Sequence, residues 1–283
     1  VCAQYDETGE FPMDLYQKAF DLGFHALEIP EQFGGSGLDY YTCCAVYEEF
    51  ARIDAGFCTG VAADGLALKT VLMFGNDEQK QYFADYICGG KGNGFAAFAL
   101  TEPDAGSDAG AGKTVAQKVG DEYVINGRKC FITNAGPAQI YVVFAITDKS
   151  KGAKGYSAFI VERDRAGVSV GKEENKMGIR LSNTADVVFD DVHVPADHLI
   201  GKEGKGYGYA MSTLDLARPI IGAMSAGIIR RCIEECVAYA KQRVTFGKPI
   251  IKHQVNSFKL ADMQIKLETT RAAVINCFNQ YYA

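Results

Sequence analysis

The chain has 283 residues, of which 48% are apolar and 23% charged, and its formal net charge at pH 7 is −6. A chain of this length and apolar content buries a large core and holds two or three compact units. This net negative charge is not the excess of lysine and arginine that binding to a phosphate backbone requires, so we expect no nucleic-acid partner. The most apolar stretches, such as residues 141–146, are strand-sized. Because no apolar run reaches the roughly 18 residues of a spanning helix, we expect no membrane span.

The nine cysteines are expected to be free thiols in a reducing compartment. Neither the Cys43-Cys44 pair nor Cys232 and Cys236 have the spacing of zinc or thioredoxin-like sites, so no metal is expected. No basic segment followed by an apolar one comes after Val1, so no targeting signal is visible. The expected location is a bacterial-like cytoplasm, or the mitochondrial matrix if a transit peptide has been lost.

Helices are predicted over residues 12–86, because apolar side chains recur there at spacings of three and four. The residues that carry this period are Leu15, Ala19, Leu22, Val46, Phe50 and Ile53. Residues 33–37, FGGSG, are predicted to be a loop between two of these helices. Asp64 lies in an otherwise apolar helical stretch, where it either faces solvent or shapes a pocket.

Strands are predicted from about Gly94 to Pro195, where the period shifts towards two. β-Branched and aromatic residues fill the runs 123–125, 141–144, 157–161 and 187–189. These runs indicate a compact β domain.

The helical period returns beyond Gly208 and continues to the end of the chain. Pro219 is expected to perturb this helix. The glycine-dense residues 201–208 are predicted to form a turn that leads into this helix, since they match neither a phosphate-binding loop nor a dinucleotide fingerprint. The absence of a strand–GxGxxG–helix unit argues against nicotinamide as the cofactor. We therefore predict an α+β chain with three parts: a helical domain at 1–93, a central β-barrel or sandwich domain at 94–200, and an incomplete helical bundle at 201–283.

Four groups of residues are candidates for chemistry, and each also has an ordinary structural explanation. Residues 98–108, FALTEPDAGSD, offer the hydroxyls of Thr101 and Ser107 and an open backbone at Gly106, but their composition is that of a turn. Residues 131–133, FIT, are typical of a buried strand with a polar end. In residues 243–247, RVTFG, the arginine suits a helix C-terminus and the glycine its exit. Asp215 and Arg218 share a helix face, as an ordinary solvated ion pair would.

These segments, in this order and with a β-rich region between helical ones, resemble the acyl-CoA dehydrogenase family, and its short-chain (butyryl-CoA) and medium-chain members look closest. The resemblance implies that FAD is the cofactor and that the first segment binds it. The implied FAD contacts in this segment are Phe98, Leu100, Thr101, Gly106 and Ser107, of which Ser107 also contacts the CoA substrate.

The resemblance assigns Phe131, Ile132 and Thr133 to the flavin as well, with the threonine near its reactive N5 edge. Tryptophan is common in the family where this chain has Phe131, so the aromatic surface is kept and the indole donor is lost. Further contacts to the FAD pyrophosphate of a neighbouring subunit are implied for Arg243, Thr245, Phe246, His253 and Gln254. We therefore expect a homotetramer built as a dimer of dimers. Substrate contacts are implied for Ser182, Asp215 and Arg218.

No catalytic base is predicted within residues 1–283. In the family a glutamate removes the substrate α-proton while the β-hydride passes to the flavin, and burial raises the pKa of that glutamate. Most members place it beyond the position of Ala283, where we expect it here. Long-chain and isovaleryl types place it one residue before the arginine, but that position is Ala217. Glu234, Glu235 and Glu268 are predicted to be solvated helix residues.

The predicted function is dehydrogenation of a short- or medium-chain acyl-CoA to the trans-2-enoyl-CoA, with electrons passed to an electron-transfer flavoprotein. Enoyl-CoA reduction, electron transfer to oxygen, and an inactive homologue that only binds flavin or acyl-CoA remain alternatives. Ala217 keeps the last of these open. A decarboxylating glutaryl-CoA type is disfavoured, because no arginine lies between Arg52 and Arg128.

Overall fold

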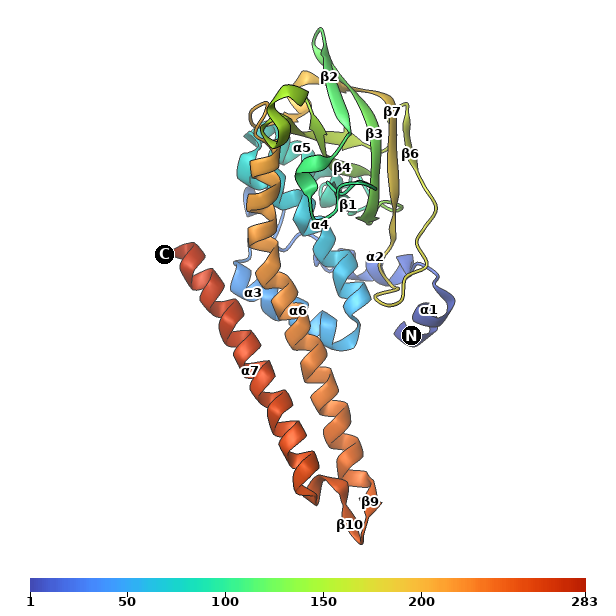
Figure 1. The fold of residues 1–283 in the computed structure, drawn as a ribbon, viewed down its shortest axis with the longest axis vertical. Helices are drawn as coiled ribbons and strands as arrows, with labels where there is room; N and C mark the ends of the chain where they lie inside the picture. Colours follow the sequence, from blue (N-terminus) through green and yellow to red (C-terminus); the bar gives the residue numbers. More distant parts are fainter. The chain divides into compact units, whose positions relative to one another are not determined.

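The computed structural model describes all 283 residues and begins with helices, as predicted (Figure 1). They are α1 (Cys2–Thr8), α2 (Met13–Asp21), the short 3-10 helix η1 (Glu31–Phe33), α3 (Tyr40–Ile53), α4 (Ala55–Phe74) and α5 (Asp77–Ile87). Asn76 and Gln79 form a reciprocal capping box at the start of α5. The Gln79 side chain also donates to the carbonyl of Leu199 at 2.8 Å, so this helix start is joined to the β region.

The β region predicted from about Gly94 to Pro195 is confirmed as one eight-stranded mixed sheet. Its strands are β1 (Ala96–Ala99), β2 (Val115–Val119), β3 (Glu122–Thr133), β4 (Ile140–Ile146), β5 (Tyr156–Glu162), β6 (Val168–Val170), β7 (Thr184–Pro195) and β8 (Leu199–Ile200). The 3-10 helices η2 (Ala109–Ala111), η3 (Lys149–Gly155) and η4 (Ala196–His198) lie between them. The order is β6-β7-β3-β2-β4-β5-β8, and β1 pairs with β4 in parallel.

The main hydrophobic core joins the apolar faces of α4 and α5 to this sheet, with side chains such as Leu68, Phe83 and Phe144 fully buried. By length and composition alone α4 would also pass as a membrane-spanning helix, with a mean hydropathy of 1.4. That is weak evidence, because a core helix has the same features, and 56% of this window is buried inside the protein. Lys69 on α4 is buried as well and forms an ion pair with buried Glu28.

Two long helices, α6 (Gly206–Gln242) and α7 (Gln254–Tyr282), make up most of the C-terminal part, and the hairpin of β9 (Val244–Thr245) and β10 (Lys248–Pro249) followed by η5 (Ile250–Lys252) joins them (Figure 1). The expectation that Pro219 perturbs the helix is wrong, since α6 continues through it. Its neighbours Leu216 and Ile220 are buried. Tertiary packing of this kind outweighs the roughly 3 kcal/mol that an interior proline costs.

Gly247 does not form the exit of α6, contrary to expectation. The helix ends at Gln242, and Gly247 instead occupies the turn of the β9–β10 hairpin together with Phe246. Both residues have positive φ, 50° for Phe246 and 73° for Gly247. A two-residue hairpin turn of type I′ needs positive φ at both positions, and its twist matches that of the flanking strands, which explains the glycine.

The chain divides into two compact units, one of residues 1–38 and 59–215 and one of residues 39–58 and 216–283. The first holds the sheet and its core, and the second groups α3 with most of α6 and all of α7. The predicted boundaries at 93 and 200 stay a prediction.

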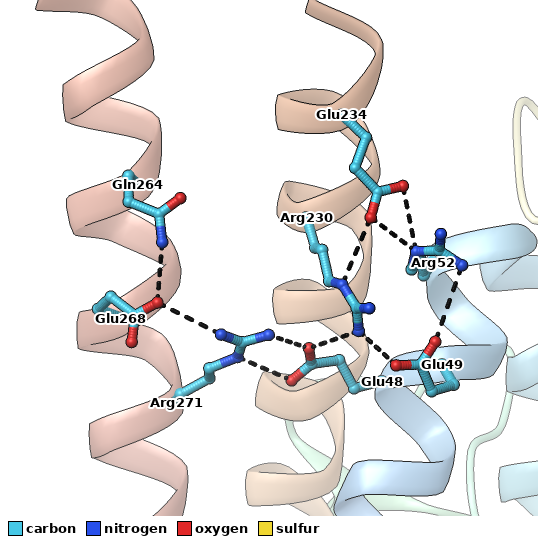
Figure 2. A network of polar contacts seen from close by, with 8 residues as sticks. All are labelled: Glu48, Glu49, Arg52, Arg230, Glu234, Gln264, Glu268 and Arg271. Carbon is cyan, nitrogen blue, oxygen red and sulfur yellow. Dashed lines mark hydrogen bonds and ion pairs between the residues drawn. The ribbon is translucent and has the colours of Figure 1, made fainter. Parts of the chain in front are cut away.

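A network of ion pairs links the three helices of the second unit (Figure 2). It comprises Glu48, Glu49 and Arg52 on α3, Arg230 and Glu234 on α6, and Gln264, Glu268 and Arg271 on α7. Glu234 accepts from Arg52 at 2.9 Å, and Glu268 accepts from Arg271 at 3.3 Å. The side chains of Glu234 and Glu268 are 38% and 59% exposed, as expected of solvated helix residues, and each is also paired with an arginine.

Glu48 is the most buried carboxylate of this network, so Glu48→Gln should lower the free energy of unfolding. Its two oxygens accept from Nε and Nη2 of Arg271 at 3.1 and 2.5 Å, and Arg230 lies nearby. Loss of the charge-assisted bonds should cost about 1–3 kcal/mol, measured by urea unfolding. Glu235→Gln is the control: its pair with Arg231 is exposed, so the change should stay below about 0.5 kcal/mol. Equal losses in both variants would contradict this prediction.

Candidate active site

The segment 98–107 leaves the end of β1 and turns sharply outwards. Glu102 and Ala105 exchange two backbone hydrogen bonds of 3.1 and 3.0 Å, which closes a tight turn. Leu100 before the turn is buried and Thr101 half-buried, whereas Gly106 and Ser107 after it are exposed. A side chain added at Gly106 would meet nothing within 4 Å. This end of the segment therefore offers a hydroxyl and open backbone to a ligand.

The segment 131–133 ends β3 in an irregular conformation that the sequence did not reveal. The register between β3 and β7 shifts between Lys129 and Ile132, and Phe131 has φ +56°. Such a bulge re-aims the side chain of the extra residue. Phe131 is accordingly 65% exposed, while Ile132 remains buried. The explanation of this segment as a merely buried strand thus fails for its aromatic residue, which presents its ring outwards.

The two segments lie side by side, because β3 is bonded to the chain that follows β1. The amide of Cys130 donates to the carbonyl of Thr101 at 2.9 Å. Lys129 donates through Nζ to the carbonyl of Leu100 at 3.0 Å and to Oε1 of Glu102 at 2.7 Å. Tertiary structure thus brings together the residues before the turn and those beside the bulge.

The Lys129–Glu102 pair is shut off from water, with side chains 0% and 5% exposed. Glu102 also accepts from the amide of Thr114 at 3.1 Å and from that of Lys113. Burial opposes ionisation of Glu102, but the Lys129 ammonium and these donors outweigh it and lower the pKa of the carboxyl. Glu102 is therefore an ionised anchor of the segment, and sequence reasoning, which took it as part of a turn, missed this role.

Ser182 lies beside the second segment, at the loop that enters β7. Thr133 pairs with Thr184, and the amide of Asn134 donates to the carbonyl of Asn183 at 3.0 Å. The Ser182 hydroxyl is buried and donates to the carbonyl of Ile179 at 2.8 Å. Its contact with a CoA substrate stays a prediction. Asp215 and Arg218, also predicted to contact substrate, are exposed on α6.

Asp64 does not face solvent, which was one of the two possibilities that the sequence left open. Its side chain on α4 is 1% exposed, and its Oδ1 accepts from the amide of Ala96 at 2.8 Å and from Nδ2 of Asn134 at 2.9 Å. Asn134 follows Thr133 directly, so Asp64 is attached to the bases of both segments. The only signal for it in the sequence was an acid in an apolar stretch.

Burial raises the pKa of Asp64 well above its usual value of 3.8, which makes folding stability depend on pH. The contribution of Asp64 is full below pH 3.8 and is lost as the pH rises towards the folded-state pKa, because the unfolded chain then releases a proton that the folded chain keeps. Asp64→Asn lacks this titration. Its stability relative to the unaltered chain should therefore rise between about pH 4 and about pH 7, measured by urea unfolding. A constant or falling difference would contradict a neutral buried acid.

The second group of predicted cofactor residues lies in the connection between α6 and α7. Thr245 and His253 share a hydrogen bond of 3.0 Å, and the rings of Phe246 and His253 meet edge-to-face at 6.0 Å. The backbone carbonyl of Arg243 accepts a hydrogen bond of 2.8 Å from the amide of Ile250, and Gln254 is the first residue of α7. All five predicted residues thus belong to one local structure, in which the Phe246 side chain is 96% exposed.

The residues of the first unit fit a flavin. An isoalloxazine ring needs an apolar surface for its face and hydrogen-bond donors along its polar edge. Exposed Phe131 supplies such a surface, and half-buried Thr101 and Thr133 supply hydroxyls. Thr133 follows Phe131 closely in the chain, and Thr101 is bonded through its carbonyl to the amide of Cys130. The exposed Gly106 and Ser107 leave room for a substrate group. The individual contacts of these residues stay a prediction.

Comparisons with known proteins identify the same chemistry across the whole chain. Residues 1–91 match the N-terminal domain, 97–192 the middle domain and 204–282 the C-terminal domain of acyl-CoA dehydrogenases. An acyl-CoA dehydrogenase of Bacillus subtilis is 43% identical over 270 residues, which cover 95% of this chain and 71% of the relative. The CarC subunit of the caffeyl-CoA reductase-Etf complex of Acetobacterium woodii is 42% identical over 282 residues, covering 98% and 73%.

A solved structure agrees with these matches. Butyryl-CoA dehydrogenase of Megasphaera elsdenii superposes with a TM-score of 0.91 at 42% identity, covering 96% of this chain and 72% of the other. The predicted α+β fold and the predicted resemblance are therefore confirmed. The chain belongs to the acyl-CoA dehydrogenase family of FAD-dependent oxidoreductases.

Proposed function

We propose that this protein takes part in the α,β-dehydrogenation of a short- or medium-chain acyl-CoA to the trans-2-enoyl-CoA, with electrons passed to an electron-transfer flavoprotein. The observation that carries the proposal is the joining of segments 98–107 and 131–133 by the Cys130–Thr101 bond and by Lys129. The butyryl-CoA dehydrogenase of similar structure supports a short acyl chain.

The residues of this chain would bind and orient the reactants. FAD, when bound, supplies the acceptor for the substrate hydride. Phe131 would cover the ring, Thr101 would hydrogen-bond along its polar edge, Thr133 would lie near N5, and Ser107 would contact the CoA substrate. A flat aromatic surface and fixed donors of this kind would hold the flavin ring in place and stabilise negative charge on its reduced form.

We assign proton abstraction to none of Glu234, Glu235 and Glu268. Each is paired with an arginine: Glu234 with Arg52, Glu235 with Arg231, and Glu268 with Arg271. The hydrogen bond from Arg52 lowers the pKa of Glu234 and so weakens it as a base. The side chains of Glu235 and Glu268 are 64% and 59% exposed to water. A base that works on a thioester needs the opposite, a pKa raised by a dry pocket.

We further propose a homotetramer in which the hairpin connection of one copy approaches the FAD of another. The support is the exposed apolar surface on and next to this connection, at Phe246, Val255, Phe258 and Ile265. Apolar surface of this extent usually marks a contact with another chain. The compartment, a bacterial-like cytoplasm or the mitochondrial matrix, also remains a proposal.

Enoyl-CoA reduction is the second candidate function, favoured by the 42% identity to a subunit of a caffeyl-CoA reductase complex. The flavin spectrum distinguishes the two directions. The purified protein is titrated anaerobically with butyryl-CoA and then octanoyl-CoA. Bleaching of the oxidised flavin band supports dehydrogenation, and the more effective ligand gives the chain length.

Bound flavin that neither ligand bleaches, but whose reduced form is reoxidised by an enoyl-CoA, would replace the first function by the second. Bound flavin that responds to none of the three ligands indicates that residues 1–283 bind the cofactor without supplying a catalytic base. Protein that retains no flavin and takes up none would overturn the proposal.

A further inference from the structure

One turn of helix α4 connects to both segments of the proposed flavin site. Asp64 accepts from the amide of Ala96, the first residue of β1, at 2.8 Å and from Nδ2 of Asn134 at 2.9 Å. The same Asn134 nitrogen donates to the carbonyl of Gly60 at 2.8 Å. A single buried side chain is thus bonded to the strand that leads into segment 98–107 and to the residue that follows segment 131–133.

We propose that Asp64 is a positioning residue: through Ala96 and Asn134 it fixes segments 98–107 and 131–133 relative to each other and so shapes the protein environment of the flavin ring. This inference rests on the proposed function, because it concerns the same site. Asp64 itself does not touch the reactants.

The backbone at the end of β3 has a conformation that needs bonds of this kind to hold it. Phe131, near the end of β3, and Asn134, just after it, have φ values of +56° and +62°, in the left-handed region. An aromatic residue seldom occupies this region, whereas asparagine enters it more readily. A conformation of this kind persists only when surrounding bonds hold it. Asn134 is held through its side chain by α4 and through its amide by Asn183, so loss of Asp64 frees one of these attachments.

The chemistry at position 64 requires an acceptor and not a charge. No cation faces the carboxyl, its Oδ2 is buried without a hydrogen-bond partner, and burial raises its pKa. A neutral side chain of the same shape therefore keeps both bonds. Asp64→Asn preserves the Oδ1 acceptor, whereas Asp64→Ala leaves the Ala96 amide and one Asn134 donor interaction unsatisfied.

The test compares Asp64→Ala, Asp64→Asn and the control Thr70→Val in the chain of residues 1–283. Thr70 lies on the same helix, is equally buried and loses one hydrogen bond of 3.0 Å to Thr213. Two readouts are used: the affinity for FAD with its absorption spectrum, and amide hydrogen exchange of residues 130–136 without FAD. Asp64→Ala should weaken FAD binding about tenfold or more and speed exchange in this segment, as expected for a lost buried acceptor.

Asp64→Asn should restore both readouts to within about twofold of the unaltered chain. Thr70→Val should lower only thermal stability. If Asp64→Ala behaves like Thr70→Val, the positioning role is overturned and Asp64 is a structural residue only.

If Asp64→Ala does not fold, Asn134→Gly replaces it. This variant keeps the positive φ and removes the side chain. Unchanged FAD binding and unchanged hydrogen exchange in Asn134→Gly would also overturn the inference. Failure of the unaltered chain to bind FAD would refute the proposed function instead, while the exchange measurement still decides the role of Asp64.

Discussion

Lys129→Met is expected to lower the free energy of unfolding by about 3–5 kcal/mol, because removing one partner of a buried ion pair leaves an uncompensated charge. The Lys129 and Glu102 side chains are 0% and 5% exposed, so water cannot replace the lost ammonium. Glu102 holds the amides of Lys113 and Thr114, and Lys129 holds the carbonyl of Leu100. We therefore expect the variant to lose FAD together with stability, measured by urea unfolding and by the flavin spectrum.

Lys113→Met provides a matched control within the same region. Lys113 also pairs with a carboxylate, Asp104, at 2.7 Å, but these side chains are 75% and 70% exposed. Exposed pairs contribute at most about 1 kcal/mol, so this variant should remain folded and bind FAD. The double variant Lys129→Met with Glu102→Gln should recover part of the loss, because it removes the unpaired charge and retains an acceptor. A Lys129→Met variant no less stable than Lys113→Met would refute the role of the pair.

Gly60→Ala is expected to cost about 3 kcal/mol, at the upper end of what overpacking a core costs. A Cβ at Gly60 would lie 1.9 Å from the hydroxyl oxygen of Tyr16 and 2.6 Å from its Cζ. Tyr16 is fully buried and stacks on Phe11 at 5.0 Å, so its ring has no free space to move into. Its hydroxyl donates to the carbonyl of Leu181 at 3.1 Å, next to Ser182. Thermal unfolding measures the loss.

The control for this glycine is Gly178→Ala, since a Cβ there meets nothing within 4 Å. It should change stability by about 0.5 kcal/mol or less, as surface substitutions do. Adding Tyr16→Phe to Gly60→Ala removes the atom nearest to the new methyl group and should restore part of the stability. If the Gly60→Ala chain is as stable as the Gly178→Ala chain, the Tyr16 ring can move away from the new methyl group and this prediction is wrong.

Much of the fold was predictable because it depends on local periodicity. The apolar spacing of three to four around α2 and α3 and the β-branched and aromatic runs of β3, β4, β5 and β7 were both visible in the sequence. β4 and β5 are buried along their whole length, so their runs are continuous and do not alternate. Local signals failed where packing overrides them. Pro219 is accommodated within α6 because flanking buried residues hold the helix, and Gly247 serves a hairpin turn and not a helix end.

The sequence by itself determined the order of helices and strands, the family, and the three motif segments that mark a flavin site. Each of these features depends on residues that are close together in the chain. Only the tertiary structure decided how those segments are supported. The outward turn of Phe131 follows from a register shift against β7, and the buried bonds of Lys129 and Asp64 join residues 27 and 70 positions apart in the chain. Periodicity indicates which face of a helix or strand is apolar. It does not indicate which distant polar atom a buried side chain will bond to once water has been excluded.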